Sequence, residues 1–301
     1  RYGANFKVSF SISGSALEQF ALHAPEVIES FQKLAKTGCV EFLAETYAHS
    51  LASLSDTDEF ERQVRRHVAR MEELFGQKPV TLRNSSLIYS DQIGERVAAM
   101  GFESMLTDGA KHVLGWKSPN FVYTNVMNPR LKLLLKNSRL SDDLTLRFSD
   151  HSWHEWPLTA DKYARWLKDS TQDSEIVNLF MNYETFGENQ LAETGIFEFM
   201  RSLPEYIFTT TDFEFLTPSE AVKKHQPVAP LHVPYPISWA DEEKDITGWL
   251  GNELQNEAFE ELFKIQPKVE ALNDPELNED YSRLQASDHF YYMRTKLFSD
   301  N

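Results

Sequence analysis

Short apolar stretches that end in polar or acidic residues recur along this chain. The clearest is residues 176–181, an apolar run as long as a typical buried strand, which leads directly into Asn182, Tyr183 and Glu184. Comparable runs, bounded by Gly, Pro or charged residues, predict further β-strands. The predicted strands are residues 6–14, 40–44, 80–83, 102–107, 144–148, 176–181 and 206–211.

Helical patterns separate most of these strands. Apolar residues at helical spacing predict helices over residues 25–37, 58–75, 91–100 and 160–170, and another helix that begins at Thr217. Alternating strands and helices indicate an α/β fold with a parallel sheet, and this many units favours a closed or nearly closed barrel over an open doubly wound sheet. The chain contains neither GxGxxG nor GxxxxGK[ST], which argues against nucleotide-binding α/β folds.

One change in composition divides the chain. Residues 226–239 contain four prolines and are predicted to be an extended linker. We therefore predict a barrel domain over residues 1–225 and a helical region over residues 240–301 that packs on it, with two long helices at 240–264 and 276–297. Because the chain begins almost directly in a strand, the barrel is expected to lack its first strand.

Charge and composition argue against several classes of function. The formal net charge is −16, so nucleic acid and an anionic membrane surface are unfavourable partners. Cys39 is the only cysteine, which rules out an internal disulfide and a site of several cysteine ligands. No apolar run reaches the ~18 residues that a membrane span requires. A location in the reducing cytoplasm is expected.

Polar side chains follow most of the predicted strands. In a parallel barrel, the groups that do chemistry lie at the carboxyl ends of the strands, so these side chains should meet on one rim. Several carboxylates, with an aromatic share of 13%, suit carbohydrate, because cleavage of a glycosidic bond needs a carboxylate pair. The alternative is that single acids are solvated or serve as helix N-caps. The residues are Glu45, Ser86, Asp108, Asp150, Asn182 with Glu184, and Asp212.

Two other chemistries are open at this point. His151 and His154, with Asp150 and Glu155 beside them, could bind zinc in a metal-dependent hydrolase such as a deacetylase, although neither an HExxH sequence nor a third distant ligand is evident. Ser86 could act as a nucleophile, but its neighbours do not form a GxSxG elbow and supply no base. We expect neither a metal ion nor a cofactor.

Several segments, in order along nearly the whole chain, form a recognisable set of motifs. They are residues 38–50 (GCVEFLAETYAHS), 82–91 (LRNSSLIYSD), 138–143 (SRLSDD), 181–188 (MNYETFGE), 215–220 (FLTPSE), 237–241 (ISWAD), 249–253 (WLGNE) and 287–292 (SDHFYY). Together these segments resemble the α-amylase branch of glycoside hydrolase family 57. The resemblance implies a (β/α)7 barrel followed by a helical region, and a retaining reaction on α-glucans without a cofactor. The expected fold class is thus α/β, an incomplete (β/α)7 barrel followed by a C-terminal helical region.

The resemblance also implies two catalytic positions, and both are substituted here. The family's nucleophilic glutamate falls at Ser86, and its acid/base aspartate falls at Asn182. A retaining mechanism needs a carboxylate about 5 Å from a carboxyl acid/base. A serine without a base is a weak nucleophile, and an amide cannot donate and recover a proton at neutral pH. Losing both groups should impair catalysis and leave the sugar-binding shell.

We therefore expect an α-amylase-like protein that binds an α-glucan, such as starch or a maltooligosaccharide, and is catalytically impaired. The open alternative is an active α-glycosidase that uses another carboxylate, such as Glu45, Asp108, Asp150 or Glu184. The expected glucan-binding side chains are Glu45, His49, Arg83, Asp108, Asp150, His151, Trp153, Tyr183, Glu184 and Trp249.

Overall fold

Seven strands form one row in the part of the chain that the computed structural model describes, residues 2–55, 57–171 and 174–295. A parallel pair, β1-β2, lies beside a five-stranded sheet of order β3-β4-β6-β5-β7. A parallel bridge from Ala44 to Leu82 joins the two, and the Arg83 amide donates to the Ala44 carbonyl oxygen at 2.8 Å. The strands are β1 Val8–Phe10, β2 Val40–Phe42, β3 Thr81–Arg83, β4 Ser104–Asp108, β5 Val122–Asn125, β6 Lys132–Lys136 and β7 Ala229–Leu231.

The sheet is mostly parallel and buried on both faces. Only β5 against β6 is an antiparallel pair among these seven strands. Alternate residues of β4 and β6 point to opposite sides, so that Met105 and Leu133 join the main core while Leu106 and Leu134 join a second apolar cluster. Burial on both faces explains why these strands are continuous apolar runs rather than alternating ones.

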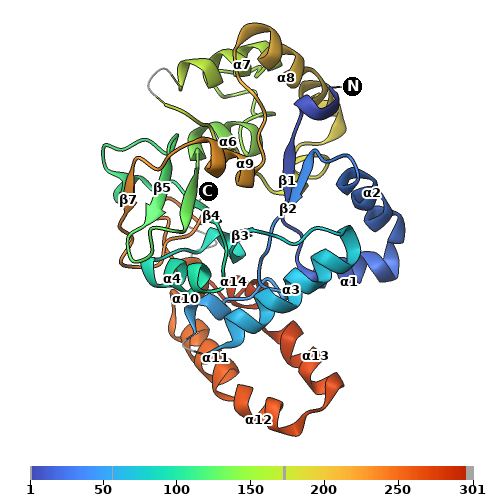
Figure 1. The fold of residues 1–301 in the computed structure, drawn as a ribbon, viewed down its shortest axis with the longest axis vertical. Coiled ribbons are helices and arrows are strands. Elements are labelled where there is room, and N and C mark those ends of the chain that lie inside the picture. Colours follow the sequence, from blue (N-terminus) through green and yellow to red (C-terminus); the bar gives the residue numbers. More distant parts are fainter. Residues whose placement is uncertain (1, 56, 172–173, 296–301) are drawn as a thin grey trace.

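Helices surround the sheet in three groups, which Figure 1 shows along the chain. None of the described helices combines the length and apolar content that crossing a membrane requires. The first group is α1 Gly14–His23, α2 Pro25–Ala35, α3 Glu59–Phe75, α4 Asp91–Ala99 and α5 Lys111–Leu114; the second is α6 Ser138–Thr145, α7 Ala160–Asp169, α8 Ile196–Thr210 and α9 Pro218–Lys224; the third is α10 Thr247–Leu250, α11 Glu253–Lys264, α12 Gln266–Leu272, α13 Pro275–Leu284 and α14 Ser287–Tyr291.

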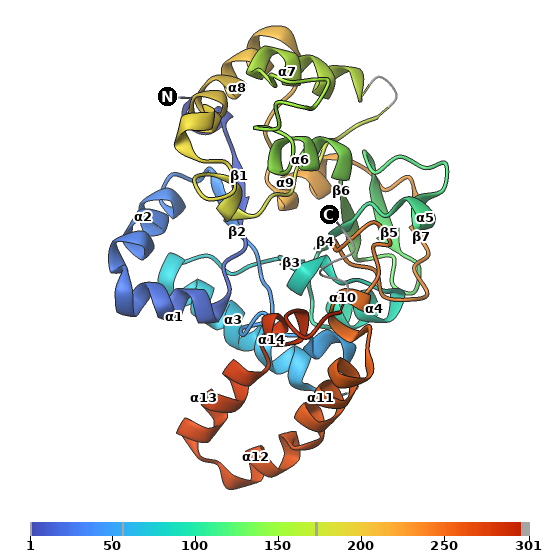
Figure 2. The same cartoon turned by 180° about the vertical axis from the view of Figure 1, so that it is seen from behind.

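Helices α6, α7 and α8, which we call the helical cap, have an apolar core of their own. Leu140 of α6, Tyr163 of α7 and Phe199 of α8 are buried together. The cap begins directly after β6, because Lys136 ends that strand and α6 starts at Ser138. Figures 1 and 2 show the cap on one side of the sheet and helices α11 to α13 on the other. The cap therefore stands over the carboxyl ends of β4 and β6.

The C-terminal helices pack on α3 and on the main core. Gln285, which follows α13, accepts a hydrogen bond from Gln63 of α3 at 2.8 Å. Arg62 of α3 forms an ion pair with Glu270 of α12. Trp249 and Phe290 are buried in the main core beside residues of the sheet. The predicted helical C-terminal region therefore exists, and it contacts the barrel.

Three of the predicted strands are not strands in the structure. Residues 144–148 contain the end of α6, and residues 206–211 contain the last turn of α8, where Ile207 is buried in the cap. Residues 176–181 lie outside every described helix and strand; the Asn137 amide donates to the Asn178 carbonyl oxygen at 2.9 Å. Ile176 and Phe180 of this segment cover the second apolar cluster of the sheet. In each of these three stretches, apolar residues pack against a core of the protein, but the stretch does not pair as a strand.

The structure also contains strands and breaks that the pattern did not predict. Strands β5 and β6 were missed, and the proline-rich stretch 226–239 contributes β7, which pairs in parallel with β5. Proline has no backbone N–H to donate to a neighbouring strand. Pro230 is acceptable in β7 because this strand lies at the edge of the sheet, where one side has no partner strand. In the described residues, the two predicted long helices are five short ones, α10 to α14. Residues 296 and 297 of the second prediction lie outside the part of the chain that the structure describes. Pro267 and Pro275 stand at the starts of α12 and α13, since proline fits the first turn of a helix but not its interior.

Candidate active-site rim

Five of the residues singled out in the sequence lie at the carboxyl ends of neighbouring strands. Glu45 and His49 follow β2, Arg83 ends β3, Ser86 follows it, and Asp108 ends β4. Two contacts hold the ends of β2 and β3 together. Thr46 and Ser85 share a hydrogen bond between their hydroxyl oxygens at 2.6 Å. Just before these residues along the chain, the Arg83 backbone N–H donates a hydrogen bond to the Ala44 carbonyl oxygen. We call this set of strand ends the rim.

Glu45 is a buried carboxylate whose two oxygens both have partners. Its side chain is 2% exposed. Ser11 Oγ donates to Oε1 at 2.8 Å, and His49 Nδ1 lies 2.8 Å from Oε2. Arg83 Nη1 lies 3.9 Å from the same oxygen. Burial alone would raise the pKa of Glu45, but the hydrogen bond and charge of His49 and the charge of Arg83 lower it to about 2.

His67 of α3 forms a hydrogen bond with the backbone of Glu45. The sequence analysis did not identify this residue. Its Nδ1 accepts the Glu45 backbone N–H at 3.3 Å, and its Nε2 lies 2.7 Å from the Ile12 carbonyl oxygen. Because a carbonyl can only accept, Nε2 carries the proton. Burial lowers the pKa of His67, which favours this neutral form. The position of His67 on the buried face of α3, between Val64 and Met71, was the signal that could have identified it.

Asp108 is as buried as Glu45 but has weaker partners. Ser138 Oγ lies 3.2 and 3.4 Å from its two oxygens, and Lys244 Nζ lies 3.8 Å from Oδ2. Burial raises the pKa of Asp108, and the charges of Lys244 and Lys136 with the Ser138 hydrogen bond do not offset it. Lys244 was also missed in the sequence, because it comes from the loop before α10, far along the chain.

Ser86 lies between these two carboxylates in a left-handed backbone conformation. Its φ is 53° and its side chain is buried. The Trp239 amide donates to the Ser86 carbonyl oxygen at 3.1 Å, and Lys244 Nζ donates to the Trp239 carbonyl oxygen at 2.8 Å. Ser86 and Asp108 are therefore linked through the loop that holds Trp239 and Lys244.

Backbone strain is concentrated at this rim. Six non-glycine residues in the described ranges have positive φ. Three of them, His49, Ser86 and Leu87, follow strands at the rim, and a fourth, Lys244, lies 3.8 Å from Asp108. Each such residue costs on the order of 1–3 kcal/mol and persists only where its surroundings impose it. Because strained residues gather at ligand sites, their position marks the rim as the candidate functional site.

Asn182, which the resemblance aligns with the family's acid/base, lies at the surface next to Tyr183 and Glu184, and all three residues are exposed. The Tyr183 ring is 6.3 Å from the Phe10 ring at the end of β1 and 6.4 Å from the Phe31 ring. This contact brings the segment to the β1 side of the rim. Among the described residues, no hydrogen bond or ion pair joins Asn182 to Ser86.

The remaining predicted residues lie away from the strand ends. Asp150 is exposed and accepts hydrogen bonds from Ser152, and the His151 ring stacks on Trp156 at 4.2 Å. Both belong, with the partly buried Trp153, to the loop between α6 and α7. Trp249 is 2% exposed and packs against Trp239 in the main core. A glucan at the rim could not touch the Trp249 ring in this structure.

A zinc site at Asp150, His151 and His154 finds no support in the geometry. In the described part of the chain, no three His, Cys, Asp or Glu side chains converge closely enough to hold a metal ion. His154 instead lies 3.5 Å from Glu155, which pairs with Lys162 at 2.6 Å. Glu155 and Lys162 thus form a surface ion pair of the cap, and His154 lies beside it.

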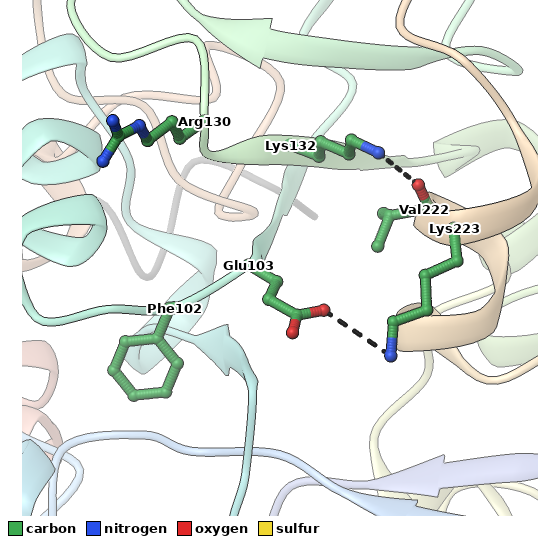
Figure 3. Close-up of a pocket in the computed structure, with 6 residues that line it drawn as sticks. All are labelled: Phe102, Glu103, Arg130, Lys132, Val222 and Lys223. Atoms are coloured by element: carbon green, nitrogen blue, oxygen red, sulfur yellow. Dashed lines mark hydrogen bonds and ion pairs between the residues drawn. The ribbon is translucent and has the colours of Figure 1, made fainter.

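A small hollow of about 310 Å³ lies at the opposite, amino-terminal ends of β4 and β6. Figure 3 shows Lys132 bonded to the Val222 carbonyl, Lys223 paired with Glu103, and Arg130 pointing away from both. Its cations are thus largely engaged with the protein itself. Chemistry in α/β barrels takes place at the other end of the strands, so this hollow is not the candidate active site.

Comparison with known proteins identifies the family. Residues 1–234 match the family model described as glycosyl hydrolase family 57. A protein named "Putative alpha-amylase" from Methanocaldococcus jannaschii is 42% identical over 307 residues, which cover 98% of this chain and 65% of that protein. The chain thus spans about two thirds of the length of that relative.

Solved structures confirm the fold. A family 57 branching enzyme from Thermococcus kodakaraensis, crystallised with glucose and additives, superposes with a TM-score of 0.71 at 14% identity, over 94% of this chain and 66% of that one. An alpha-amylase from Thermotoga maritima superposes with a TM-score of 0.63 at 14% identity, over 95% and 68%. The fold is therefore α/β with parallel sheets, similar to the (β/α)7 barrel of this family, with a helical C-terminal region, as predicted.

Proposed function

This chain belongs to glycosyl hydrolase family 57, and from that premise we propose that it binds an α-glucan at the rim and hydrolyses it poorly or not at all. The ligand class is a starch-type or maltooligosaccharide chain. The proposal concerns this chain, which covers part of its relative's length. A cytoplasmic location, for which the single cysteine is the argument, belongs to the proposal as well.

The observation that carries the proposal is the chemistry available at Ser86. The resemblance assigns the nucleophile to this position, but no described side chain makes a hydrogen bond to its hydroxyl group. A serine attacks a glycosidic carbon only when a base removes its proton, and retention needs a carboxylate in its place. Asn182, at the acid/base position, has no titratable proton. Both chemical steps therefore lack their usual groups.

The charged groups at the ends of β2, β3 and β4 support retention of binding. Glu45, Arg83 and His49 form one connected group, and Asp108 is held by Ser138 and Lys244. The carboxylates can accept hydrogen bonds from sugar hydroxyls at the rim, and the cationic groups can donate hydrogen bonds to them. Their mutual bonds also hold the strand ends in position without a ligand, so the site is preorganised.

A second candidate function is an active retaining glycosidase that uses Glu45 and Asp108. One observation favours it: the two buried carboxylates have pKa values moved in opposite directions, Glu45 lowered and Asp108 raised. Opposite shifts are what a nucleophile and an acid require. Against it, both Glu45 oxygens are already occupied by Ser11 and His49. Starch hydrolysis by the native chain, abolished in Glu45→Gln and in Asp108→Asn, would establish this candidate.

The test of the first proposal is reversion of both family positions. The Ser86→Glu, Asn182→Asp double variant should release reducing sugar from amylose at least about 10²-fold faster than the native chain, the lower end of what positioned acid–base groups contribute. The matched control is Ser86→Gln, Asn182→Asp, which adds the same volume at the buried position without a carboxylate. The control should stay as inactive as the native chain.

Binding is measured on the same proteins by calorimetric titration with maltoheptaose. Native chain that binds no glucan at millimolar concentration would contradict the binding half of the proposal. A folded double variant that binds glucan but gains no activity over its glutamine control would contradict the assignment of Ser86 and Asn182 as the lost pair.

A further inference from the structure

A second hollow lies in the helical cap, between α6, α7 and the loop that joins them. Its volume is about 880 Å³, within the range of small-molecule sites. Glu45, Ser86 and Asp108 do not line it, so it is separate from the rim. The two sites are nevertheless neighbours in the fold, because Ser138 at the start of α6 bonds Asp108 and the next residue, Arg139, lines the hollow.

Helical spacing brings the polar lining together. Arg139, Asp143 and Arg147 are four residues apart along α6 and the residues after it, so they share one face. Arg147 Nη1 donates to Asp143 Oδ1 at 2.6 Å, which fixes both groups. From α7, Trp166 and Asp169 are three residues apart and reach the same hollow. The site is thus built from two helices rather than from loop residues alone.

Two tryptophans supply its apolar surface. Trp153 from the loop and Trp166 from α7 both line the hollow, and both are partly buried against the cap core. Their ring centroids are 5.9 Å apart and the ring planes meet at 76°, so the rings form a corner. An aromatic surface beside convergent polar groups is the usual lining of a site for a small organic molecule. The apolar face of a sugar ring fits such a surface, while its hydroxyls reach the polar groups.

The charges argue for a neutral ligand. Two arginines, Arg139 and Arg147, face three carboxylates, Asp143, Glu155 and Asp169. These nearly balance, so the hollow has no strong field to attract an ion. The hollow at the amino-terminal end of the strands, by contrast, has three cations against Glu103. Alternating donors and acceptors around aromatic rings suit a polyhydroxylated molecule without net charge.

We propose that the cap hollow is a second glucan-binding site, in which a glucose unit packs against Trp153 and Trp166. Its hydroxyl groups exchange hydrogen bonds with Arg139 and the carboxylates of Asp143 and Asp169. This inference rests on the proposed function, because it takes the same α-glucan as its ligand. The site would hold a part of the chain that extends from the rim, and would increase affinity for long glucans more than for short ones.

The test compares maltoheptaose and maltose binding by calorimetric titration. The Trp153→Ala, Trp166→Ala double variant should bind maltoheptaose about tenfold more weakly, a loss of about 1.4 kcal/mol, with little change for maltose. The matched control is Trp116→Ala, which removes a tryptophan that is 93% exposed and does not line the hollow; its affinity should equal that of the native chain. Arg83→Gln serves as the rim variant and should weaken binding of both sugars.

Unchanged maltoheptaose affinity in the double tryptophan variant, with the Arg83→Gln loss present, overturns the second site and leaves the proposed function standing. Absence of binding in the native chain overturns both. If the double variant does not fold, Arg139→Gln and Asp169→Asn replace it, because both side chains are exposed. Each should then weaken maltoheptaose binding about threefold, and no loss in either would overturn the second site.

Discussion

Glu45 and Asp108 are two carboxylates at the ends of strands in the same row, and both are almost fully buried. The pKa of Glu45 falls to about 2, whereas that of Asp108 rises. Glu45 has Ser11 and His49 at 2.8 Å. Asp108 has Ser138 at 3.2 Å and its cation, Lys244, only at 3.8 Å. Both carboxylates are buried, so the distance and number of their partners decide whether the pKa is lowered or raised.

This difference separates the rim into two halves with different physical roles. On the Glu45 half, a buried anion is compensated by close donors, and removing either partner leaves an unpaired charge. On the Asp108 half, the ionised form is poorly compensated, so the carboxylate is a net cost near neutral pH. Ser86 lies between them in its left-handed conformation. The Glu45 half should therefore be rigid, and the Asp108 half should tolerate change.

The largest effect that would test this contrast is expected for Glu45→Ala. Removing the carboxylate leaves His49 and Arg83 without their anion and Ser11 without its acceptor, so the free energy of unfolding should fall by about 3–5 kcal/mol. Urea denaturation at pH 7 measures it. Glu184→Ala, at an exposed carboxylate, is the control and should stay within about 0.5 kcal/mol of the native chain. If Glu45→Ala lowers the free energy of unfolding by less than about 1 kcal/mol, the proposed contrast between the two halves of the rim is wrong.

The pH dependence of stability should show the Glu45 half directly. Its pKa is lowered from 4.5 to about 2 on folding, so its contribution is complete above pH 4.5 and is lost as the pH falls toward 2. The size of that contribution is about 3 kcal/mol. The native chain should therefore lose stability over this interval relative to Glu45→Gln, measured by urea midpoints at successive pH values. Parallel profiles for the two proteins would contradict the lowered pKa.

The smallest effect, with the opposite sign, is expected for Asp108→Asn. A raised pKa means that stability is complete below the ordinary value of 3.8 and is lost as the pH rises through the folded-state pKa. At pH 7 the amide should thus be as stable as the carboxylate, or up to about 1 kcal/mol more stable. Asp212→Asn, at an exposed position, is the control. A clear loss of stability in Asp108→Asn alone would show that the two halves are alike.

Much of the rim was predictable from local pattern. Strands β2, β3 and β4 are short apolar runs that end in polar residues, and chain direction then puts Glu45, Ser86 and Asp108 at one edge of the sheet. The family resemblance added the expectation that Ser86 stands at the position of the nucleophile. His67 and Lys244 were not predictable in the same way, because one lies on a helix and the other in a distant loop, and neither follows a strand.

The predictions were wrong where the same local sequence pattern fits more than one structure. Residues 206–211 are rich in β-branched and aromatic residues, which favour a strand. Ile207 nevertheless belongs to α8, whose apolar face packs in the core of the cap. Residues 226–239 looked like a linker because of their prolines, yet Pro230 occupies an edge strand. Trp249 was expected at the rim, but its ring is buried in the main core. In each case the partner across space, not the local sequence, decided the outcome.

By itself, then, the sequence determined the family, the alternation of parallel strands and helices, and the absence of carboxylates at two positions. These follow from side-chain type and local periodicity, which neighbours in the chain already express. The tertiary structure alone decided which buried carboxylate has a lowered pKa and which has a raised one, which strands pair, and that two tryptophans meet in the cap. Those properties depend on distances of a few ångströms between residues far apart in the chain, and desolvation and Coulomb energies change sharply over such distances.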